Sequence, residues 1–335
     1  MTTGFETSTD AQILQHDLEP LILEALKERA PVRAIQWERF ELATSYDAHV
    51  AIVHFDSGET RKVFAKNFGS TVRPKDSPKQ RREREVRVYR DFLNGAGLGT
   101  AGYYGSILDD SQGRLWLLLE YVEGTPVGYL DIATSWAPAA AALGRLHGHF
   151  ATHGSALDGC GFLVHHTREF FWSKVELASR CVSAIAPDRT SELAAIVRRY
   201  APVVDVFAEQ PRTLIHGGCR STNILVNVLG DPSRVCIIDW EEAAYGAPLY
   251  DVAYLLDGIE PPTLDPLLDA YRQEALAYGL TLPDRRNTKH IIDCFRLHMI
   301  IVMLSQAVLK SYTAQAVGKL LGIGRRLADV VAFQN

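Results

Sequence analysis

The stretch that decides the fold of this chain is Leu214–Val226, with the sequence LIHGGCRSTNILV, followed after a short gap by Cys236–Glu241, CIIDWE. The apolar, β-branched runs within these two segments are typical of short buried strands. Gly230–Ser233 lies between them with the sequence GDPS, which predicts a turn, so the two runs should pair as a hairpin. Asn223 leads into the first strand and Asp239 ends the second, so both should come to the same end of the hairpin.

Asn223 and Asp239 are therefore our candidate metal ligands, because amide and carboxylate oxygens are the ligands that Mg²⁺ prefers. His216, after an apolar pair, is of a kind that more often makes structural hydrogen bonds than shuttles protons. Asp251 heads an apolar helix within Gly246–Ala253, GAPLYDVA. It could cap that helix, or it could brace the preceding loop from a buried position, and the sequence favours neither role.

The remaining elements divide the chain into two halves. Strands are predicted at Phe40–Leu42, Val50–Phe55, Arg61–Lys66, Tyr103–Leu108 and Arg114–Tyr121, and one charged helix at 79–94. After Glu123–Pro126, helices are predicted at 135–149, 168–184, 188–209, 264–279, 288–311 and 314–333. We therefore expect an α+β fold with two lobes. Residues 1–122 would form a small, mainly antiparallel β lobe with one key helix, and residues 123–335 a larger, mostly helical lobe.

Lys66 ends the predicted strand VFAK, from which its ammonium group could reach the α- and β-phosphates of a nucleotide. The ordinary alternative is a solvated lysine on an edge strand. Glu85 lies on the side of the apolar stripe of the following helix and could hold that ammonium group, as a helical glutamate does in kinases. Glu83 is the alternative partner, and since arginines surround both glutamates, both could belong to a solvated charged face.

Bulk properties narrow the function classes. The chain has 335 residues, of which 47% are hydrophobic, enough for a sizeable core. A formal charge of −5 gives no reason to expect nucleic acid or an anionic membrane as a partner. The first residues lack the features of a secretory signal, and no apolar run approaches the roughly 20 residues that span a bilayer. Five scattered cysteines without a C-x-x-C pair indicate reduced thiols and a cytoplasmic location.

Together these motifs resemble the aminoglycoside phosphotransferase and choline kinase family, which has a protein-kinase-like fold. The family's loop H-G-D-x-x-x-x-N corresponds to His216–Asn223, and its motifs I-D-W-E and G-x-P-x-Y-D-[LV]-A correspond to Ile238–Glu241 and Gly246–Ala253. Glu85–Tyr89 is similar to its first-lobe helix, and Leu143–His147 to its L-x-x-L-H helix. The resemblance extends over most of the chain, and the order and spacing of its motifs are specific.

The resemblance implies a kinase that uses ATP and Mg²⁺ and transfers the γ-phosphate to a hydroxyl group. Backbone groups of Glu120, Tyr121 and Val122 would then bind the adenine. The acceptor would be a small molecule, often cationic and antibiotic-like, or a peptide. Acidic candidates for holding it are Glu241, Glu242, Asp257 and Glu260, although solvated helix ends are the ordinary alternative.

Gly218 departs from the family, because it stands where the family carries the catalytic aspartate that accepts or orients the hydroxyl proton. A general base contributes about 10²–10⁴-fold to a rate. Phosphoryl transfer depends mostly on positioning and on metal charge, so a slow kinase could remain. In one interpretation the base is relocated, to Glu241, to Glu242, to a residue of the C-terminal helices or to the substrate itself.

A second interpretation is a pseudokinase, a scaffold that holds ATP without turnover, or a site that an obligate protein partner completes. A third is a different enzyme class on the same fold, with Cys219 or Arg220 in a new role. A buried thiol is the ordinary alternative for Cys219. Arg220 could bind phosphate through its planar fork or lie at the surface. An engineered loss of the carboxylate is also compatible with the sequence.

Overall fold

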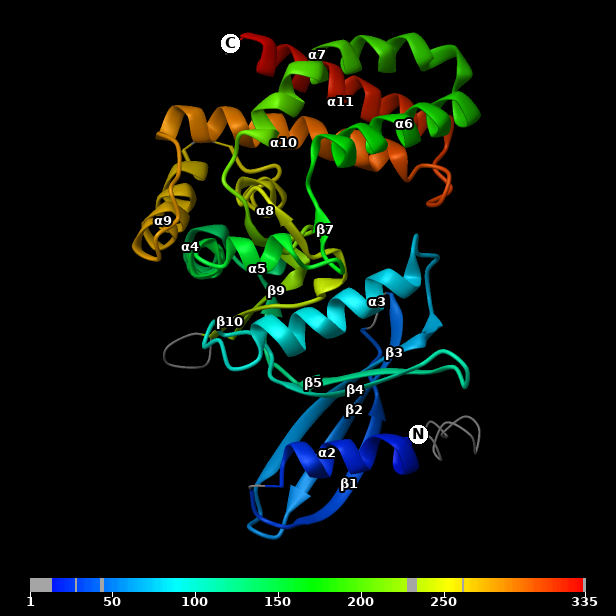
Figure 1. The fold of residues 1–335 in the computed structure, drawn as a ribbon, viewed down its shortest axis with the longest axis vertical. Helices are drawn as coiled ribbons and strands as arrows, with labels where there is room; N and C mark the ends of the chain where they lie inside the picture. Colours follow the sequence, from blue (N-terminus) through cyan, green and yellow to red (C-terminus); the bar gives the residue numbers. More distant parts are fainter. Residues whose placement is uncertain (1–13, 28, 43–44, 228–233, 261, 334–335) are drawn as a thin grey trace. The chain divides into compact units, whose positions relative to one another are not determined.

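The computed structural model describes residues 14–27, 29–42, 45–227, 234–260 and 262–333, whose ribbon is drawn in Figure 1. The chain divides into two compact units, Met1–Lys75 with Val86–Glu123, and Asp76–Glu85 with Gly124–Asn335. The lobe boundary expected at residue 122 stays a prediction. The contacts place Asp76–Glu85 with the second unit.

The first unit is built on a five-stranded antiparallel sheet with the strand order β1-β2-β3-β5-β4. These strands are β1 (Val32–Arg39), β2 (Tyr46–Phe55), β3 (Thr60–Thr71), β4 (Tyr103–Asp109) and β5 (Arg114–Glu120). A π-helical turn (Leu14–Leu18) and α2 (Glu19–Ala25) bury Leu14, Leu18 and Ile22 in one core with residues of the sheet. β3 is therefore a central strand, between β2 and β5.

The strand predicted at Phe40–Leu42 is wrong, because β1 occupies Val32–Arg39 and residues 41–42 form a turn. Most side chains of β1 are exposed or only partly buried. Because few of its side chains are buried, apolar and polar residues do not alternate strictly along the strand, and its periodicity in the sequence is weak. Asp56–Gly58 turns the chain between β2 and β3, with Gly58 at a φ of 85°.

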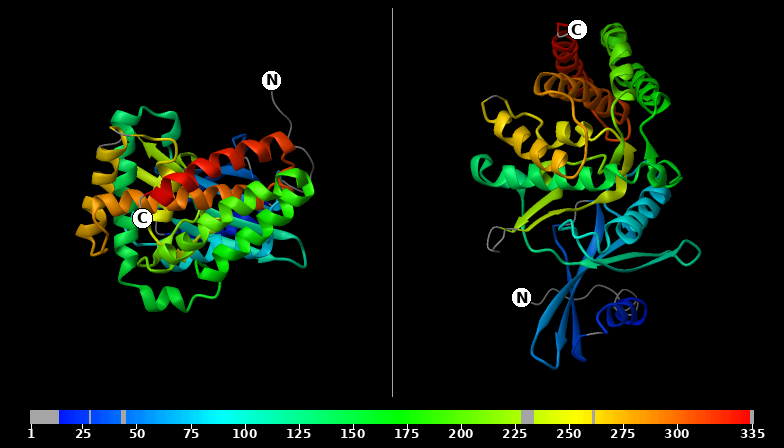
Figure 2. Two further views of the ribbon diagram at one scale, coloured as in Figure 1. Left: turned by 90° about the horizontal axis from the view of Figure 1, so that it is seen from above. Right: turned by 60° about the vertical axis from the view of Figure 1, so that its left-hand side comes forward.

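The second unit is mainly helical. Its helices are α4 (Ile132–Ala151), α5 (Gly154–Asp158), α6 (Arg168–Ile185), α7 (Thr190–Ala208), α8 (Leu249–Leu255), α9 (Leu264–Ala277), α10 (Arg285–Ser305) and α11 (Ala314–Phe333). α3 (Pro78–Arg87) is divided between the two units and continues as a π-helical turn, Val88–Leu93. Within the second unit, α10 packs against α6, α7, α8 and α11, an arrangement visible in Figure 2. These helices include all six predicted from periodicity, although α10 ends at Ser305 and not at residue 311 as predicted.

Two small sheets lie among the helices and carry the loop that decides the fold. One has the order β10-β9-β6 and the other β7-β11-β8. Their strands are β6 (Thr125–Pro126), β7 (Val164–His165), β8 (Thr213–Ile215), β9 (Ile224–Asn227), β10 (Arg234–Ile237) and β11 (Ala244–Gly246). The turn predicted at Gly230–Ser233 lies outside the described residues. The α+β class, with an antiparallel β lobe and a helical lobe, is confirmed.

None of the helices in the described ranges is both long and apolar enough to cross a membrane.

Candidate active site

The loop from His216 to Asn223 is held in place by the buried carboxylate of Asp251. The backbone N–H groups of His216 and Gly217 donate hydrogen bonds to this carboxylate, with N–O distances of 2.6 and 3.0 Å. His147 Nε2 lies 3.2 Å from the same group. The residue that caps α8 is Pro248, so of the two roles that the sequence left open for Asp251, the structure shows the brace.

The imidazole of His216 is occupied on both sides. Its Nδ1 accepts a hydrogen bond from the N–H of Gly218 at 3.3 Å, and its Nε2 lies 2.8 Å from the carbonyl oxygen of Ile238. Since a carbonyl can only accept, Nε2 carries the proton and donates it. This arrangement favours a structural role for His216 rather than a proton shuttle.

Gly217 brings the loop against the chain that follows the hairpin. Its φ is +78°, a conformation that favours glycine. A Cβ at this position would lie 2.1 Å from the carbonyl oxygen of Glu242. The close approach therefore requires a residue without a side chain.

The predicted metal ligands come to the same end of the hairpin. β9 and β10 pair antiparallel with Ile224 opposite Ile237, and the N–H of Ile238 donates to the carbonyl oxygen of Asn223 at 2.9 Å. The side-chain amide of Asn223 donates to the carbonyl of Gly218 at 3.2 Å, which points its nitrogen at the loop. Asp239 has a φ of 68°, a left-handed conformation that turns the chain sharply after the strand.

Two more carboxylates accompany Asp239. Ligand oxygens of Glu85, Asp239 and Glu241 all lie within 4.8 Å of one another, and Glu85 and Glu241 are buried. Carboxylates this close repel each other unless a cation or protons neutralise them, so the group fits a divalent ion. The sequence predicts Glu85 as the partner of Lys66 and Glu241 as a residue that holds the acceptor, and it does not predict this grouping.

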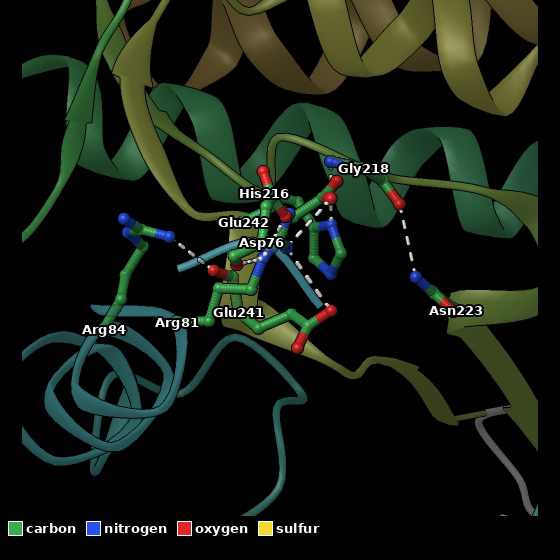
Figure 3. Close-up of polar contacts among 8 residues, drawn as sticks. All are labelled: Asp76, Arg81, Arg84, His216, Gly218, Asn223, Glu241 and Glu242. Carbon is green, nitrogen blue, oxygen red and sulfur yellow. Dashed lines mark hydrogen bonds and ion pairs between the residues drawn. The ribbon is translucent and has the colours of Figure 1, made fainter. Parts of the chain in front are cut away.

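Two buried arginines of α3 hold the segment that follows Asp239 (Figure 3). Arg81 Nη1 donates to Glu242 Oε1 at 3.0 Å and to Glu241 Oε1 at 3.4 Å, and Arg81 Nε donates to Asp76 at 2.9 Å. Burial opposes the charge of Arg81, but the carboxylates of Glu242, Asp76 and Glu241 outweigh it and raise its pKa. Arg84 Nη1 donates to the carbonyl of Glu241 at 2.6 Å. Sequence reasoning missed both arginines because they lie in a run that looks like a solvated face.

The side chain of Glu242 lies against Gly218. An ideal Cβ built on Gly218 would be 2.5 Å from Glu242 Oε2. The Glu242 side chain keeps 30% of its surface exposed, whereas that of Glu241 keeps 6%. Burial and the charge of Glu242 together raise the pKa of Tyr254 to about 12. The guanidinium of Arg220, an exposed residue, lies 5.6 Å from the ring of Tyr254.

Cys219 is buried, whereas two of the acids proposed for the acceptor, Asp257 and Glu260, lie at the surface. Cys219 is fully buried, and burial raises the pKa of its thiol, which argues against a nucleophilic role. Asp257 and Glu260 are exposed and follow the end of α8, while Asp251, near the start of that helix, holds the loop.

The first unit holds the residues predicted to contact a nucleotide. Lys66 is buried on the central strand β3, with its ammonium group 5.1 and 5.4 Å from the rings of Tyr46 and Phe68. The alternative of a solvated edge-strand lysine is thus excluded. Glu120 ends β5, where its carboxylate accepts a hydrogen bond from the N–H of Gly102 at 3.1 Å. Tyr121 and Val122 follow directly.

Solved structures with a similar fold include two antibiotic phosphotransferases and a choline kinase. A GDP complex of a mutant aminoglycoside 2'-phosphotransferase-IIIa is 16% identical, with a TM-score of 0.63 over 95% of this chain and 98% of that one. Macrolide 2'-phosphotransferase MphH from Brachybacterium faecium is 16% identical, with a TM-score of 0.57 over 91% and 98%. Choline kinase LicA from Streptococcus pneumoniae is 13% identical, with a TM-score of 0.54 over 93% and 99%.

The sequence itself defines the family. Residues 16–289 match the phosphotransferase enzyme family, and the chain belongs to it. Among proteins with curated functions, none matches this sequence. The family match supports a phosphotransferase, and the neighbouring structures share its fold.

Proposed function

We propose that this protein is a kinase that uses ATP and Mg²⁺ to phosphorylate a hydroxyl group of a small molecule. The observation that carries the proposal is the register of the β9–β10 hairpin. Asn223 and Asp239 flank one end of this hairpin, beside a loop whose backbone N–H groups donate to the buried Asp251 carboxylate. The carboxylates of the buried residues Glu85 and Glu241 lie next to Asp239 and add negative charge that a bound cation would neutralise.

Each residue then has a defined task. Asn223 and Asp239 would hold the Mg²⁺ ion, whose charge neutralises the phosphate oxygens during transfer. Asp251 keeps the loop in one conformation through its two backbone hydrogen bonds. In the first unit, Lys66 is proposed to contact the α- and β-phosphates, and the backbone of Glu120–Val122 the nucleotide base. The GDP and ADP complexes among the structural neighbours support a nucleotide ligand, which we propose to be ATP, and GTP is the alternative to test beside it.

For the acceptor we propose a cationic hydroxyl compound. The neighbouring folds include a kanamycin complex, a choline kinase and an aminopropanol kinase. Kanamycin, choline and aminopropanol each carry a cationic nitrogen and a hydroxyl group. The chain's net charge of −5 is compatible with such a cation. Five free thiols support a cytoplasmic location for the enzyme.

A scaffold that binds the nucleotide without turnover is the second candidate, and the observation that favours it is Gly218. Without a carboxylate at this position, residue 218 itself cannot accept the acceptor's proton. A peptide acceptor or a protein partner that completes the site belongs to this alternative.

Thermal unfolding with ATP or GTP, each with and without Mg²⁺, tests nucleotide binding. A ligand at 100 times its Kd stabilises the folded state by about 2.7 kcal/mol, so a clear rise in Tm is expected with nucleotide and Mg²⁺ together. Asp239→Asn should abolish the Mg²⁺-dependent part, while Asp257→Asn, an exposed residue, serves as the matched control. No stabilisation by either nucleotide would refute both the kinase and the scaffold.

Release of nucleoside diphosphate in the presence of kanamycin, choline or 1-amino-2-propanol then distinguishes the two candidates. Turnover that depends on one of these acceptors supports the kinase. Binding without any turnover, including hydrolysis by water, would instead support the scaffold.

A further inference from the structure

We propose that Glu242 supplies the carboxylate that residue 218 lacks and acts as the general base toward the acceptor hydroxyl. The inference rests on the proposed kinase function and names a catalytic residue for it. Kinase catalytic loops commonly carry a carboxylate that accepts the proton of the attacking hydroxyl, and residue 218 cannot supply one. Three observations connect that need to Glu242.

The first observation is the position of the Glu242 carboxylate. Its Oε2 lies 2.5 Å from the point where a Cβ of residue 218 would stand. An aspartate's own carboxylate oxygens lie at about that distance from its Cβ. A carboxylate oxygen from Glu242 is therefore about as close to the loop backbone at this point as an aspartate side chain at residue 218 would bring one.

The second observation is that the Glu242 carboxylate in this position and a side chain on residue 218 exclude each other. A Cβ that approaches an oxygen to 2.5 Å overlaps it, so any larger residue at 218 would force the Glu242 side chain away. Only glycine leaves room for this carboxylate. Gly218 therefore has a positive role in the structure, and its presence does not by itself indicate a dead site.

The third observation is how Glu242 is held. The left-handed conformation of Asp239 leads into a 3-10 turn, Trp240–Glu242, whose last carbonyl packs against Gly217. Arg81 binds Oε1 at 3.0 Å and so fixes one oxygen, while Oε2 is the oxygen that lies by Gly218. With 30% of its side chain exposed, Glu242 remains open to a substrate.

Glu241 is a poorer candidate for the base. Its side chain is 6% exposed, and its oxygens belong to the group with Glu85 and Asp239 that fits a cation. Arg84 holds its carbonyl group in addition. The adjacent glutamates thus divide the work, with Glu241 beside the metal ligands and Glu242 beside the acceptor's loop.

The chemical step balances without a further reagent. The acceptor's hydroxyl oxygen forms a bond to the γ-phosphorus of the nucleoside triphosphate, and the bond from that phosphorus to the β-phosphate oxygen breaks. The hydroxyl proton passes to a Glu242 oxygen and from there to water. The products are the phosphorylated acceptor and a nucleoside diphosphate, and no oxidation or reduction occurs.

Four variants test the inference, with ATP and Mg²⁺ as donor and kanamycin, choline or water as acceptor. Glu242→Gln keeps the size of the side chain and one oxygen for Arg81, but it cannot take the proton. We expect kcat to fall by about 10²-fold, near the lower limit for general bases because positioning dominates this reaction, while the nucleotide Kd stays unchanged. Gly218→Ala should also lower kcat, since its Cβ displaces the Glu242 oxygen and adds no carboxylate.

The decisive variant moves the carboxylate back. Gly218→Asp combined with Glu242→Gln places an acid on residue 218 and removes the competing charge, so its kcat should exceed that of Glu242→Gln alone. Glu209→Gln, an exposed glutamate at the end of α7, is the matched control and should retain wild-type kcat.

The outcomes separate this inference from the proposed function. A wild-type protein that transfers phosphate, with an equally fast Glu242→Gln variant, would overturn the role of Glu242 and leave the kinase intact. A loss of nucleotide affinity in Glu242→Gln as large as its loss of kcat would also overturn that role. So would a double variant no faster than Glu242→Gln. A wild-type protein that binds nucleotide without turnover, next to an active double variant, would overturn it in favour of the scaffold. A wild type that binds no nucleotide would refute the proposed function itself.

Discussion

Substituting Asp251 should destabilise the second unit by an amount that depends on how many acceptor oxygens remain. The carboxylate is fully buried and accepts hydrogen bonds from the N–H groups of His216 and Gly217. His147 Nε2 lies 3.2 Å from Oδ2 and is the third donor. A buried donor left without an acceptor costs about 1–3 kcal/mol.

Asp251→Ala removes the acceptor of all three donors, so the free energy of unfolding should fall by roughly 3–9 kcal/mol. That loss is comparable to the whole stability of a domain, about 5–15 kcal/mol, and a large unfolded fraction is expected. Asp251→Asn keeps one oxygen in the same place. If that oxygen serves His216 and His147, only the Gly217 donor is lost, at a cost of roughly 1–3 kcal/mol.

Urea unfolding followed by circular dichroism measures both values, and hydrogen exchange at the Gly217 amide reports on the loop directly. Asp257→Asn is the control, because an exposed acid beyond the end of the same helix should change stability by less than about 0.5 kcal/mol. An Asp251→Asn protein as stable as this control, or one whose Gly217 amide stays protected, would refute the brace. Equal losses for the Asn and Ala variants would refute the counting of donors.

Three further outcomes follow from single contacts. Gly217→Ala should destabilise the protein by more than Gly258→Ala, because the two glycines have φ of +78° and +77° but only the first would bring a Cβ within 2.1 Å of a carbonyl oxygen; urea unfolding of both variants would contradict this if the losses were equal. Burial lowers the pKa of His166 to about 3, so charging it disfavours the folded state. Wild-type stability should therefore be fully present above the unfolded-state pKa of about 6.5 and fall by up to about 1.4 kcal/mol per pH unit below it, and His166→Phe should flatten that slope in unfolding measured from pH 7 to pH 4.5. Iodoacetamide should label the partly exposed Cys160 of the native protein long before the buried Cys219, as mass spectrometry of the two peptides would show, and equal labelling would contradict the burial of Cys219.

The fold was largely predictable because most of its elements depend on local patterns. Long helices such as α6, α7 and α11 have apolar faces that recur at helical spacing over many residues, and their ends lie within a few residues of those predicted. β1 failed because most of its side chains are exposed or only partly buried. Where burial is slight, the sequence has little reason to alternate, and periodicity loses its information.

The site was predictable where it depends on strand geometry. Asn223 and Asp239 flank a short antiparallel hairpin, so their approach follows from pairing alone. Arg81 and Arg84 show the limit of this reasoning. They lie in a helix so rich in charge that a solvated face was the natural interpretation, and only tertiary contacts with Glu241 and Glu242 reveal that they are buried.

Gly218 illustrates a stronger limit, because a sequence shows which side chain a position lacks but cannot show which other side chain occupies its space. Sequence reasoning could name Glu241 and Glu242 as substitutes for the missing base without choosing between them. The choice depends on the left-handed turn at Asp239, which directs one glutamate toward the cation group and the next toward the loop. A positive φ at a non-glycine residue is rarely evident from sequence. Because adjacent residues in such a turn face different surroundings, two neighbouring glutamates that look equivalent in the sequence can have different chemical roles.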